Sequence, residues 1–194
     1  MLFGSDNPGL RQFLTVYRLV IQKQIPIPHK NGRIVDVNNA IEGEGPFAPE
    51  RSGGLPITKF LKYIYNNRIG LEEANNMIYG KGGLAAYFDT TDFAALMDSY
   101  QKGKDEKIKL VIDAMAYQIS KEIASMAVAV SGDVDAIVFT GGLAYSKTFL
   151  NLITNKIKFI SKNIMVFPGE DELLAMAEGI LNYLKGDVEI NVYI

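Results

Sequence analysis

The sequence predicts an α/β domain, in which helices cover a sheet and parallel strands are joined by right-handed crossovers. Two observations support this prediction. Strand-like and helix-like segments alternate over residues 104–184, which is the order of elements that builds such a sheet. Within this region, residues 137–139 are Ile, Val and Phe, a continuous apolar run typical of a buried parallel strand. Gly141-Gly142 then ends the strand in a tight turn that leads into an apolar helix.

Each element follows from the spacing of apolar residues and from the residues at its ends. Asn31-Gly32 is a hairpin-turn signal before a strand, and Thr91 is a plausible N-cap for a helix that ends near Gly103. A strand over residues 164–167 is expected to be buried and to end at Pro168-Gly169. The predicted strands cover residues 33–37, 134–140 and 164–167, and the predicted helices cover residues 57–65, 71–79, 92–103, 104–130, 145–157 and 173–184.

The longest periodic segment, residues 104–130, is predicted to be a long helix packed on the sheet. Its apolar residues recur on one face, and its methionines fit core packing better than a cofactor site. That face consists of Ile108, Val111, Ile112, Met115, Ile119, Ile123, Met126 and Val130.

Bulk composition argues against several classes of function. The chain has 194 residues, 48% apolar and 22% charged, as in an ordinary globular protein. Its 20 basic and 22 acidic residues give a net charge of −2, so no nucleic-acid or membrane-surface partner is expected. It has no cysteine and one histidine, His29, which excludes thiolate chemistry and argues against a His-based triad or a multi-histidine metal site. Because no apolar stretch could span a membrane and the start lacks a secretion signal, we expect a cytoplasmic protein.

The first 28 residues carry the least information. Residues 13–21 are apolar enough for a strand or a short helix, but Pro26 and Pro28 would interrupt a regular element soon after it. We expect an unmatched segment here, either an edge strand or a weakly docked arm. Residues 29–194 are expected to form the domain proper.

The glycine pair is a candidate ligand site. Gly141 and Gly142 would let a ligand approach the backbone without meeting a Cβ atom, and the N–H groups at the start of the next helix suit an anionic group. A nucleotide is the obvious candidate. The alternative is that the two glycines only permit a sharp turn between strand and helix.

Three further segments carry candidate polar residues. The long Gly- and Pro-rich loop over residues 38–54 contains Arg51, which is a functional candidate or a member of a surface ion pair. Residues 80–83 are Gly-Lys-Gly-Gly, which lacks the spacing of a phosphate loop and is expected to be a flexible turn. The acids at residues 170–172 follow a predicted strand, as the glycine pair does, so both fall on the rim where α/β sheets bind ligands. Those acids also suit the positive end of a helix.

Seven blocks, taken together and in order, resemble the butyrate kinase family. That family belongs with acetate kinase in the superfamily of acetate and sugar kinases, heat-shock chaperones and actin. The similarity runs from about His29 to the C-terminus. The blocks are residues 35–40 (VDVNNA), 42–47 (EGEGPF), 49–53 (PERSG), 80–84 (GKGGL), 114–119 (AMAYQI), 139–146 (FTGGLAYS) and 168–172 (PGEDE).

The resemblance implies a fold and an activity. The fold would be the C-terminal ATP-binding domain of an actin-like ATPase, related to ribonuclease H, with a mixed sheet and helices on both faces. The activity would be that of a butyrate kinase, which transfers the γ-phosphoryl group of ATP to a short-chain carboxylate to give an acyl phosphate, with Mg²⁺ as the cofactor. A homo-oligomer, or a separate N-terminal half, is the expected protein partner.

The resemblance also implies roles for particular residues. Gly141 and Gly142, with Leu143 and Tyr145 after them, match the turn that holds the adenosine end of ATP. Arg51 matches the active-site arginine that binds the carboxylate or the transferring phosphoryl group, a task suited to its two-pronged guanidinium. Asp171 and Glu172 match an acidic pair near Mg²⁺, which prefers carboxylate ligands.

The chain also departs from the family pattern. Family members have two similar domains with ATP between them, and this chain resembles the second. Where the family has a His-Leu-Gly-Gly-Gly loop, residues 24–28 are Gln-Ile-Pro-Ile-Pro, and proline lacks the N–H that a phosphate cradle needs. We therefore expect the chain alone to be inactive or slow, and to expose an apolar patch where the first domain would lie. The alternatives are a non-catalytic remnant or interaction module, half of a split enzyme, or an acetate or propionate kinase.

Overall fold

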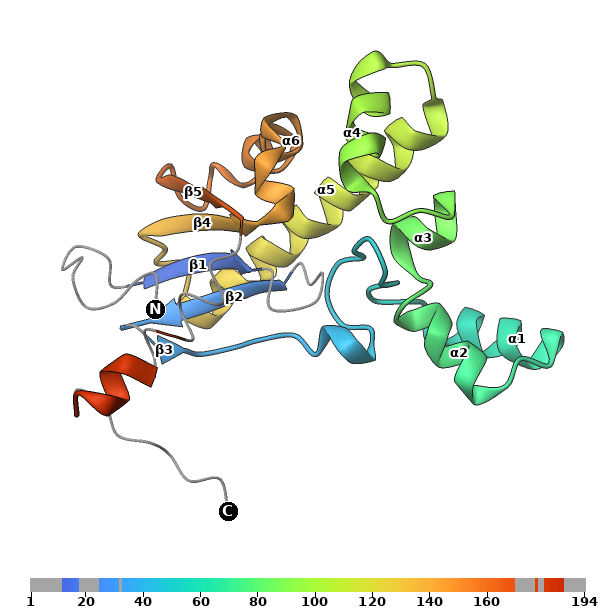
Figure 1. Cartoon of the computed structure of the whole chain (residues 1–194), viewed down its shortest axis with the longest axis horizontal. Coiled ribbons are helices and arrows are strands. Elements are labelled where there is room, and N and C mark those ends of the chain that lie inside the picture. The colour runs from blue at the N-terminus through green and yellow to red at the C-terminus, as the bar shows by residue number, and fades with distance from the viewer. Residues whose placement is uncertain (1–11, 18–24, 32, 170–176, 178–179, 187–194) are drawn as a thin grey trace.

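The structure is a computed structural model that describes residues 12–17, 25–31, 33–169, 177 and 180–186. Its centre is a five-stranded sheet in the order β3-β2-β1-β4-β5 (Figure 1). β1 and β4 are parallel, as are β4 and β5, whereas β2 is antiparallel to both of its neighbours. The sheet is therefore mixed, as predicted. The strands are β1 (Gln12–Tyr17), β2 (Ile25–Lys30), β3 (Arg33–Ile34), β4 (Ala136–Gly141) and β5 (Ile164–Pro168).

Apart from α3, which the sequence analysis did not predict, the α-helices among the described residues 33–169 lie close to the positions that apolar spacing predicts. Three short 3₁₀ helices, η1 (Ala40–Glu42), η2 (Ala127–Val130) and η3 (Gly142–Tyr145), join or extend regular elements. The predicted 104–130 helix is α5 followed by η2. The α-helices are α1 (Ile57–Asn67), α2 (Leu71–Ile78), α3 (Gly83–Phe88), α4 (Phe93–Lys102), α5 (Glu106–Met126) and α6 (Lys147–Ile157).

The main core lies between one face of the sheet and helices α5 and α6. Ile137 and Phe139 of β4 point into it, because alternate residues of a strand face the same side. The predicted apolar face of α5 is buried there, with Ile108 partly buried at its edge. The opposite face of β4 carries Ala136 and Val138, which are fully buried. Most of the helix predicted over residues 173–184 lies outside the described residues, so helices on both faces remain a prediction.

The N-terminal segment differs from the expectation. β1 lies between β2 and β4, so the prediction of an edge strand or a weakly docked arm is wrong for residues 12–17. Pairing with two neighbours, which sequence periodicity does not report, places it inside the sheet. β2 (residues 25–30) extends across residue 28, where the sequence analysis ended the N-terminal segment. It pairs with β3 through a hairpin whose turn residue Asn31 has a φ of 51°.

Three local predictions also need correction. The strand predicted over residues 33–37 stops at Ile34. The Val35 N–H still donates to the Pro28 carbonyl at 3.0 Å, but the Val37 N–H donates locally to Asp36 Oδ1 at 2.8 Å and does not join the sheet. β5 lies at the sheet edge and is not buried: Val166 is 41% exposed. The N-cap of α4 is not Thr91 but Asp92, whose carboxylate accepts from the Ala95 N–H at 3.0 Å.

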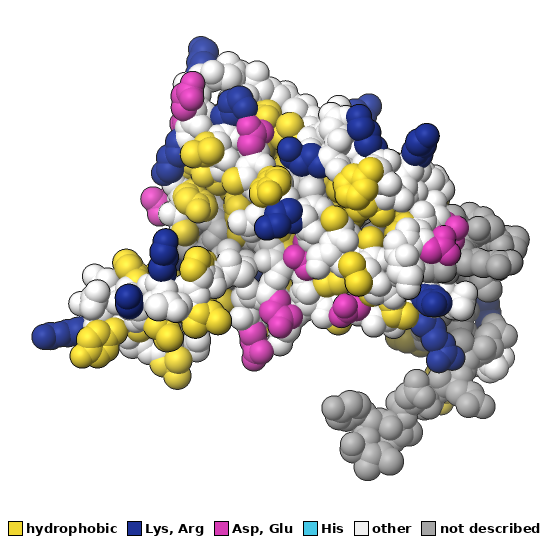
Figure 2. Space-filling model, turned by 180° about the vertical axis from the view of Figure 1, so that it is seen from behind, with side chains coloured by type: hydrophobic (Ala, Val, Ile, Leu, Met, Phe, Trp, Pro, Cys, Tyr) yellow, Lys and Arg dark blue, Asp and Glu magenta, His cyan; other side chains and the backbone are white. Residues whose placement is uncertain are grey.

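The hairpin of α1 and α2 projects from the body of the molecule (Figure 1). α1 has no buried residue, although its sequence has a clear apolar face. Hydrophobic side chains accordingly gather on this projection in the view from behind (Figure 2). Within the described part of the chain, no helix combines the length and hydrophobicity that a membrane crossing requires.

Candidate functional site

A cavity of about 540 Å³ lies beside the carboxyl end of β4. Helix α4 provides one wall, and the turn and helix that follow β4 provide another. Ile119 of α5 and Phe139 of β4 line the core side. Apolar and polar residues both line the space. They include Phe93, Ala94, Met97, Asp98 and Gln101 from α4, and Gly142, Leu143, Tyr145, Lys147 and Thr148 from the segment after β4.

The glycine turn shapes one side of this cavity. Gly141 has a φ of 82°, a backbone conformation that favours glycine. It exchanges two hydrogen bonds with Gly169, at 3.1 and 3.2 Å, so the residue just before the acidic block lies beside the glycine pair. After η3, Ser146 caps α6: its Oγ accepts from the Phe149 N–H at 3.3 Å. The predicted strand–glycine–helix unit is therefore present.

Helices α4 and α6 are joined across the cavity by two contacts. The rings of Phe93 and Phe149 meet edge to face, with their centres 4.9 Å apart. Farther along α4, Gln101 Nε2 donates to Thr148 Oγ1 at 3.0 Å. All four side chains line the cavity. The contact at the start of α4 is apolar and the contact near its end is polar, so the two ends of α4 offer different chemistry to the cavity.

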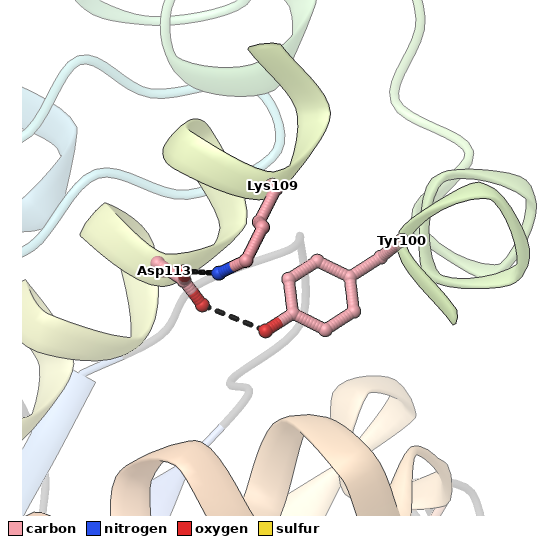
Figure 3. A network of polar contacts seen from close by, with 3 residues as sticks. All are labelled: Tyr100, Lys109 and Asp113. Atoms are coloured by element: carbon pink, nitrogen blue, oxygen red, sulfur yellow. Dashed lines mark hydrogen bonds and ion pairs between the residues drawn. The ribbon is translucent and has the colours of Figure 1, made fainter. Parts of the chain in front are cut away.

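A polar network anchors α4 to α5 (Figure 3). The Tyr100 hydroxyl donates to Asp113 Oδ1 at 2.7 Å, and Lys109 Nζ donates to Asp113 Oδ2 at 2.6 Å. Partial burial by itself would raise the pKa of Asp113, but the hydrogen bonds from Lys109 and Tyr100 outweigh it and lower that pKa. Burial and the bond to Asp113 raise the pKa of Tyr100. The network therefore holds an ionised carboxylate and fixes the wall that α4 presents to the cavity.

The arginine loop, residues 45–54, is closed by a hydrogen bond from the Gly54 N–H to the Gly45 carbonyl at 3.0 Å. Arg51 within it is only 2% exposed, and its guanidinium carbon lies 4.6 Å from the centre of the Tyr79 ring. The alternative placed Arg51 at the surface, and the burial of its side chain contradicts that location. A buried guanidinium is costly to desolvate, which makes Arg51 a stronger functional candidate.

The glycines at residues 80–83 hold this loop in place. Gly83 has a φ of 60°, and a Cβ atom there would overlap the Ala48 carbonyl oxygen. A Cβ atom on Gly82 would lie 2.9 Å from the Arg51 carbonyl carbon. The Gly80 N–H also donates to the Glu50 carbonyl at 2.8 Å. The prediction of a flexible turn missed the role of these glycines, which is to let the backbone of residues 80–83 pack closely against the backbone of the arginine loop.

The structure brings several predicted site residues together. Gly142, Leu143 and Tyr145 line the cavity, and Pro49 of the arginine loop lines it too. Asp171 and Glu172 lie outside the described residues, although Gly169, two residues before Asp171, is next to the glycine pair. In the part of the chain that is described, no three His, Cys, Asp or Glu side chains gather closely enough to hold a metal ion.

Sequence reasoning missed the contribution of α4. Ala94, Asp98 and Gln101 line the cavity from this helix. Their spacing of four and three residues puts them on one helical face. The sequence did contain a signal for this wall: Asp98 and Gln101 are polar residues on the same face of a helix that also carries apolar residues.

The sequence profile of the acetokinase family matches residues 29–166 of this chain. Butyrate kinase 1 of Clostridium acetobutylicum is 44% identical over 165 residues, which are 85% of this chain and 46% of the relative. A probable butyrate kinase of Coprothermobacter proteolyticus is 46% identical with the same two coverages. The chain therefore spans about half the length of these curated relatives.

Solved structures resemble the fold. The acetate kinase of Porphyromonas gingivalis superposes with a TM-score of 0.74 at 19% identity, over 89% of this chain and 49% of that one. A propionate kinase from Francisella tularensis gives a TM-score of 0.68 at 22% identity, over 84% of this chain and 46% of that one. The fold is therefore the one that these acetate and propionate kinase structures share, in agreement with the predicted fold class.

Proposed function

The chain belongs to the acetokinase family, and from this premise we propose that it is the nucleotide-binding half of a butyrate kinase-type phosphotransferase. In the proposed reaction, a carboxylate oxygen of butyrate forms a bond to the γ-phosphorus of ATP while the bond from that phosphorus to ADP breaks. The products are ADP and butyryl phosphate. The observation that carries the proposal is the cavity where the glycine turn, helix α4 and Pro49 of the arginine loop meet.

The cavity suits the adenosine part of ATP. Its volume of about 540 Å³ lies in the range of small-molecule sites, and its mixture of apolar walls and a few polar groups is typical of them. Gly142 offers backbone without a side chain, and the start of α6 offers N–H groups. Leu143 and Tyr145, on the same side, would cover the sugar and base.

Arg51 would act on the phosphoryl and carboxylate groups. A guanidinium can contact two oxygens at once and offset charge that spreads over the transferring phosphoryl group. The stacked Tyr79 ring and the clamped loop backbone would limit its rotamers. A fixed cation of this kind helps catalysis by requiring little reorganisation.

We propose Mg²⁺ as the cofactor of ATP, with Asp171 and Glu172 as the acids near it. Carboxylates, directly or through water, are the protein groups that Mg²⁺ prefers. The bound ion would neutralise phosphate charge. We also propose a cytoplasmic location, because a chain without cysteine suits a reducing compartment.

Butyrate is the preferred acceptor in this proposal because relatives at 44% and 46% identity are named butyrate kinases. Acetate or propionate is the alternative acceptor. Because phosphoryl transfer depends on positioning both substrates, we expect the chain alone to bind ATP and to form acyl phosphate slowly or not at all. A non-catalytic interaction module is the second candidate function.

The expected protein partner is a second copy of the chain or a separate N-terminal half. The supporting observation is the apolar face of the α1–α2 hairpin, where Ile57 is 75%, Tyr65 84% and Leu71 79% exposed. Apolar patches of this kind mark interaction surfaces. Either partner would remove the face from water.

Calorimetric titration of the chain with Mg·ATP tests the proposal. We expect binding, and Gly142→Val should weaken it about tenfold or more, because the new side chain fills the cavity. Gly70→Val is the matched control, since a Cβ atom there meets nothing within 4 Å. No binding by the unmodified chain, or equal binding by both variants, would contradict the site. Acyl phosphate formation, measured with butyrate, acetate and propionate, tests the reaction and its acceptor.

A further inference from the structure

We propose that Gln101, held by Thr148, reads the purine base and selects an exocyclic amino group over a carbonyl oxygen at position 6. The site would then prefer adenine to hypoxanthine nucleotides. This inference rests on the proposed nucleotide site and adds its base specificity.

The cavity has two ends along α4. Phe93 is the first residue of α4, and Figure 1 shows the start of α4 nearer to the arginine loop than its end. Gln101 is eight residues later, about 12 Å along the axis at 1.5 Å per residue. In the proposed reaction the phosphates must reach Arg51 of that loop. The base therefore lies at the far end, beside Gln101.

The hydrogen bond to Thr148 gives Gln101 a defined chemistry. Its Nε2 atom donates to Thr148 Oγ1 at 3.0 Å, and the carbonyl oxygen of the same amide remains as an acceptor. No hydrogen bond to that oxygen occurs among the described residues. Asp98, one turn earlier on the same helix face, adds carboxylate acceptors to this wall.

An acceptor-rich wall distinguishes the two kinds of purine. Adenine presents an amino group at position 6, which donates to an acceptor such as the Gln101 carbonyl. Hypoxanthine presents an oxygen there, which would face other acceptors without a proton between them. The nearby lining residues Met97, Leu150 and Ile153 are apolar, so they can pack on the rings without favouring either base. Sites built to bind a polar group discriminate strongly against analogues that lack it.

Lys147 lines the cavity close to Thr148 and offers a rival arrangement. If the phosphates pointed to this end, Lys147 would bind them and Gln101 would not meet the base. Lys147→Met would then weaken ADP far more than it weakens adenosine. In the proposed orientation, that variant affects the two ligands alike.

The test compares ADP with IDP, whose bases differ in the group at position 6 and in the proton that hypoxanthine carries on N1, by calorimetry on the full 194-residue chain. We expect the unmodified chain to bind ADP about tenfold more tightly than IDP. Gln101→Leu, which keeps the side-chain size, should bring the ratio to about one by weakening ADP. Thr148→Val, which frees the amide, should reduce the ratio partly. Lys102→Ala, an exposed neighbour outside the cavity, is the control and should leave the ratio unchanged.

Two results would overturn the inference alone: equal binding of ADP and IDP by the unmodified chain, or an unchanged preference in Gln101→Leu. If Lys147→Met weakened the binding of ADP far more than that of adenosine, the inference would also fail, because the phosphates would then lie at the Lys147 end of the cavity. Failure of both nucleotides to bind would remove the proposed function, and this inference with it. Thermal unfolding of each variant shows whether it is folded.

Discussion

Replacing Gly83 by alanine should displace the arginine loop and destabilise the chain. Gly83 has a φ of 60°, and the added Cβ atom would overlap the Ala48 carbonyl oxygen and lie 2.6 Å from that of Arg51. Both obstacles are backbone atoms, so no side-chain rotation relieves them. The strand-like pair formed by Ala48 and Arg51 must therefore move as a unit.

The expected loss has two parts. A residue with a Cβ atom pays about 1–2 kcal/mol for the left-handed conformation. Overpacking adds about 1–3 kcal/mol. The free energy of unfolding should thus fall by about 2–5 kcal/mol, which lowers Tm by roughly 10 °C for a chain of this length.

Gly103→Ala separates the two parts. Gly103 has a φ of 65°, close to that of Gly83, but a Cβ atom there meets nothing within 4 Å. This variant should lose only the conformational part, about 1–2 kcal/mol. Urea unfolding followed by circular dichroism measures both variants. Equal losses in the two would refute the close packing of Gly83 against the arginine loop.

Two further predictions concern the α4 anchor and the α1 face. The lowered pKa of Asp113 stabilises the fold above its usual value of 3.8, and this contribution is lost as pH falls through the lowered pKa. Asp113→Asn should therefore flatten the fall in stability on acidification, by less than about 1 kcal/mol because the side chain is 37% exposed; identical pH profiles from urea unfolding would contradict this role. Leu61→Glu, on the exposed apolar face, should reduce concentration-dependent association in sedimentation velocity, whereas Asn66→Glu, on the opposite side of α1, should not. An unmodified chain that stays monomeric at all concentrations would count against self-association.

Local sequence patterns predicted the helices well because their cause is local. The apolar face of α5 recurs every three to four residues, and burial of Met115 and Ile123 follows directly. The interior position of β1 depends instead on pairing with β4, more than a hundred residues away in the sequence. The cavity wall formed by Asp98 and Gln101 likewise appears only when α4 is placed opposite α6. The pairing of β1 with β4 leaves no periodic signal in either strand. The spacing of Asp98 and Gln101 marks a shared helical face but does not show which segment lies opposite it.

The backbone contacts that assemble this site can be recognised in the sequence mainly by their glycines. Gly141 pairs its backbone with Gly169, and Gly82 and Gly83 let the chain after α2 pass against the arginine loop. A backbone-to-backbone contact uses atoms that every residue has, so it constrains sequence only where a Cβ atom would intrude. The sequence around Lys81 predicts a flexible turn, whereas the neighbouring glycines allow close packing of two backbones. The same reasoning explains why the glycine pair could be located from sequence, while the partners that give it a cavity could not.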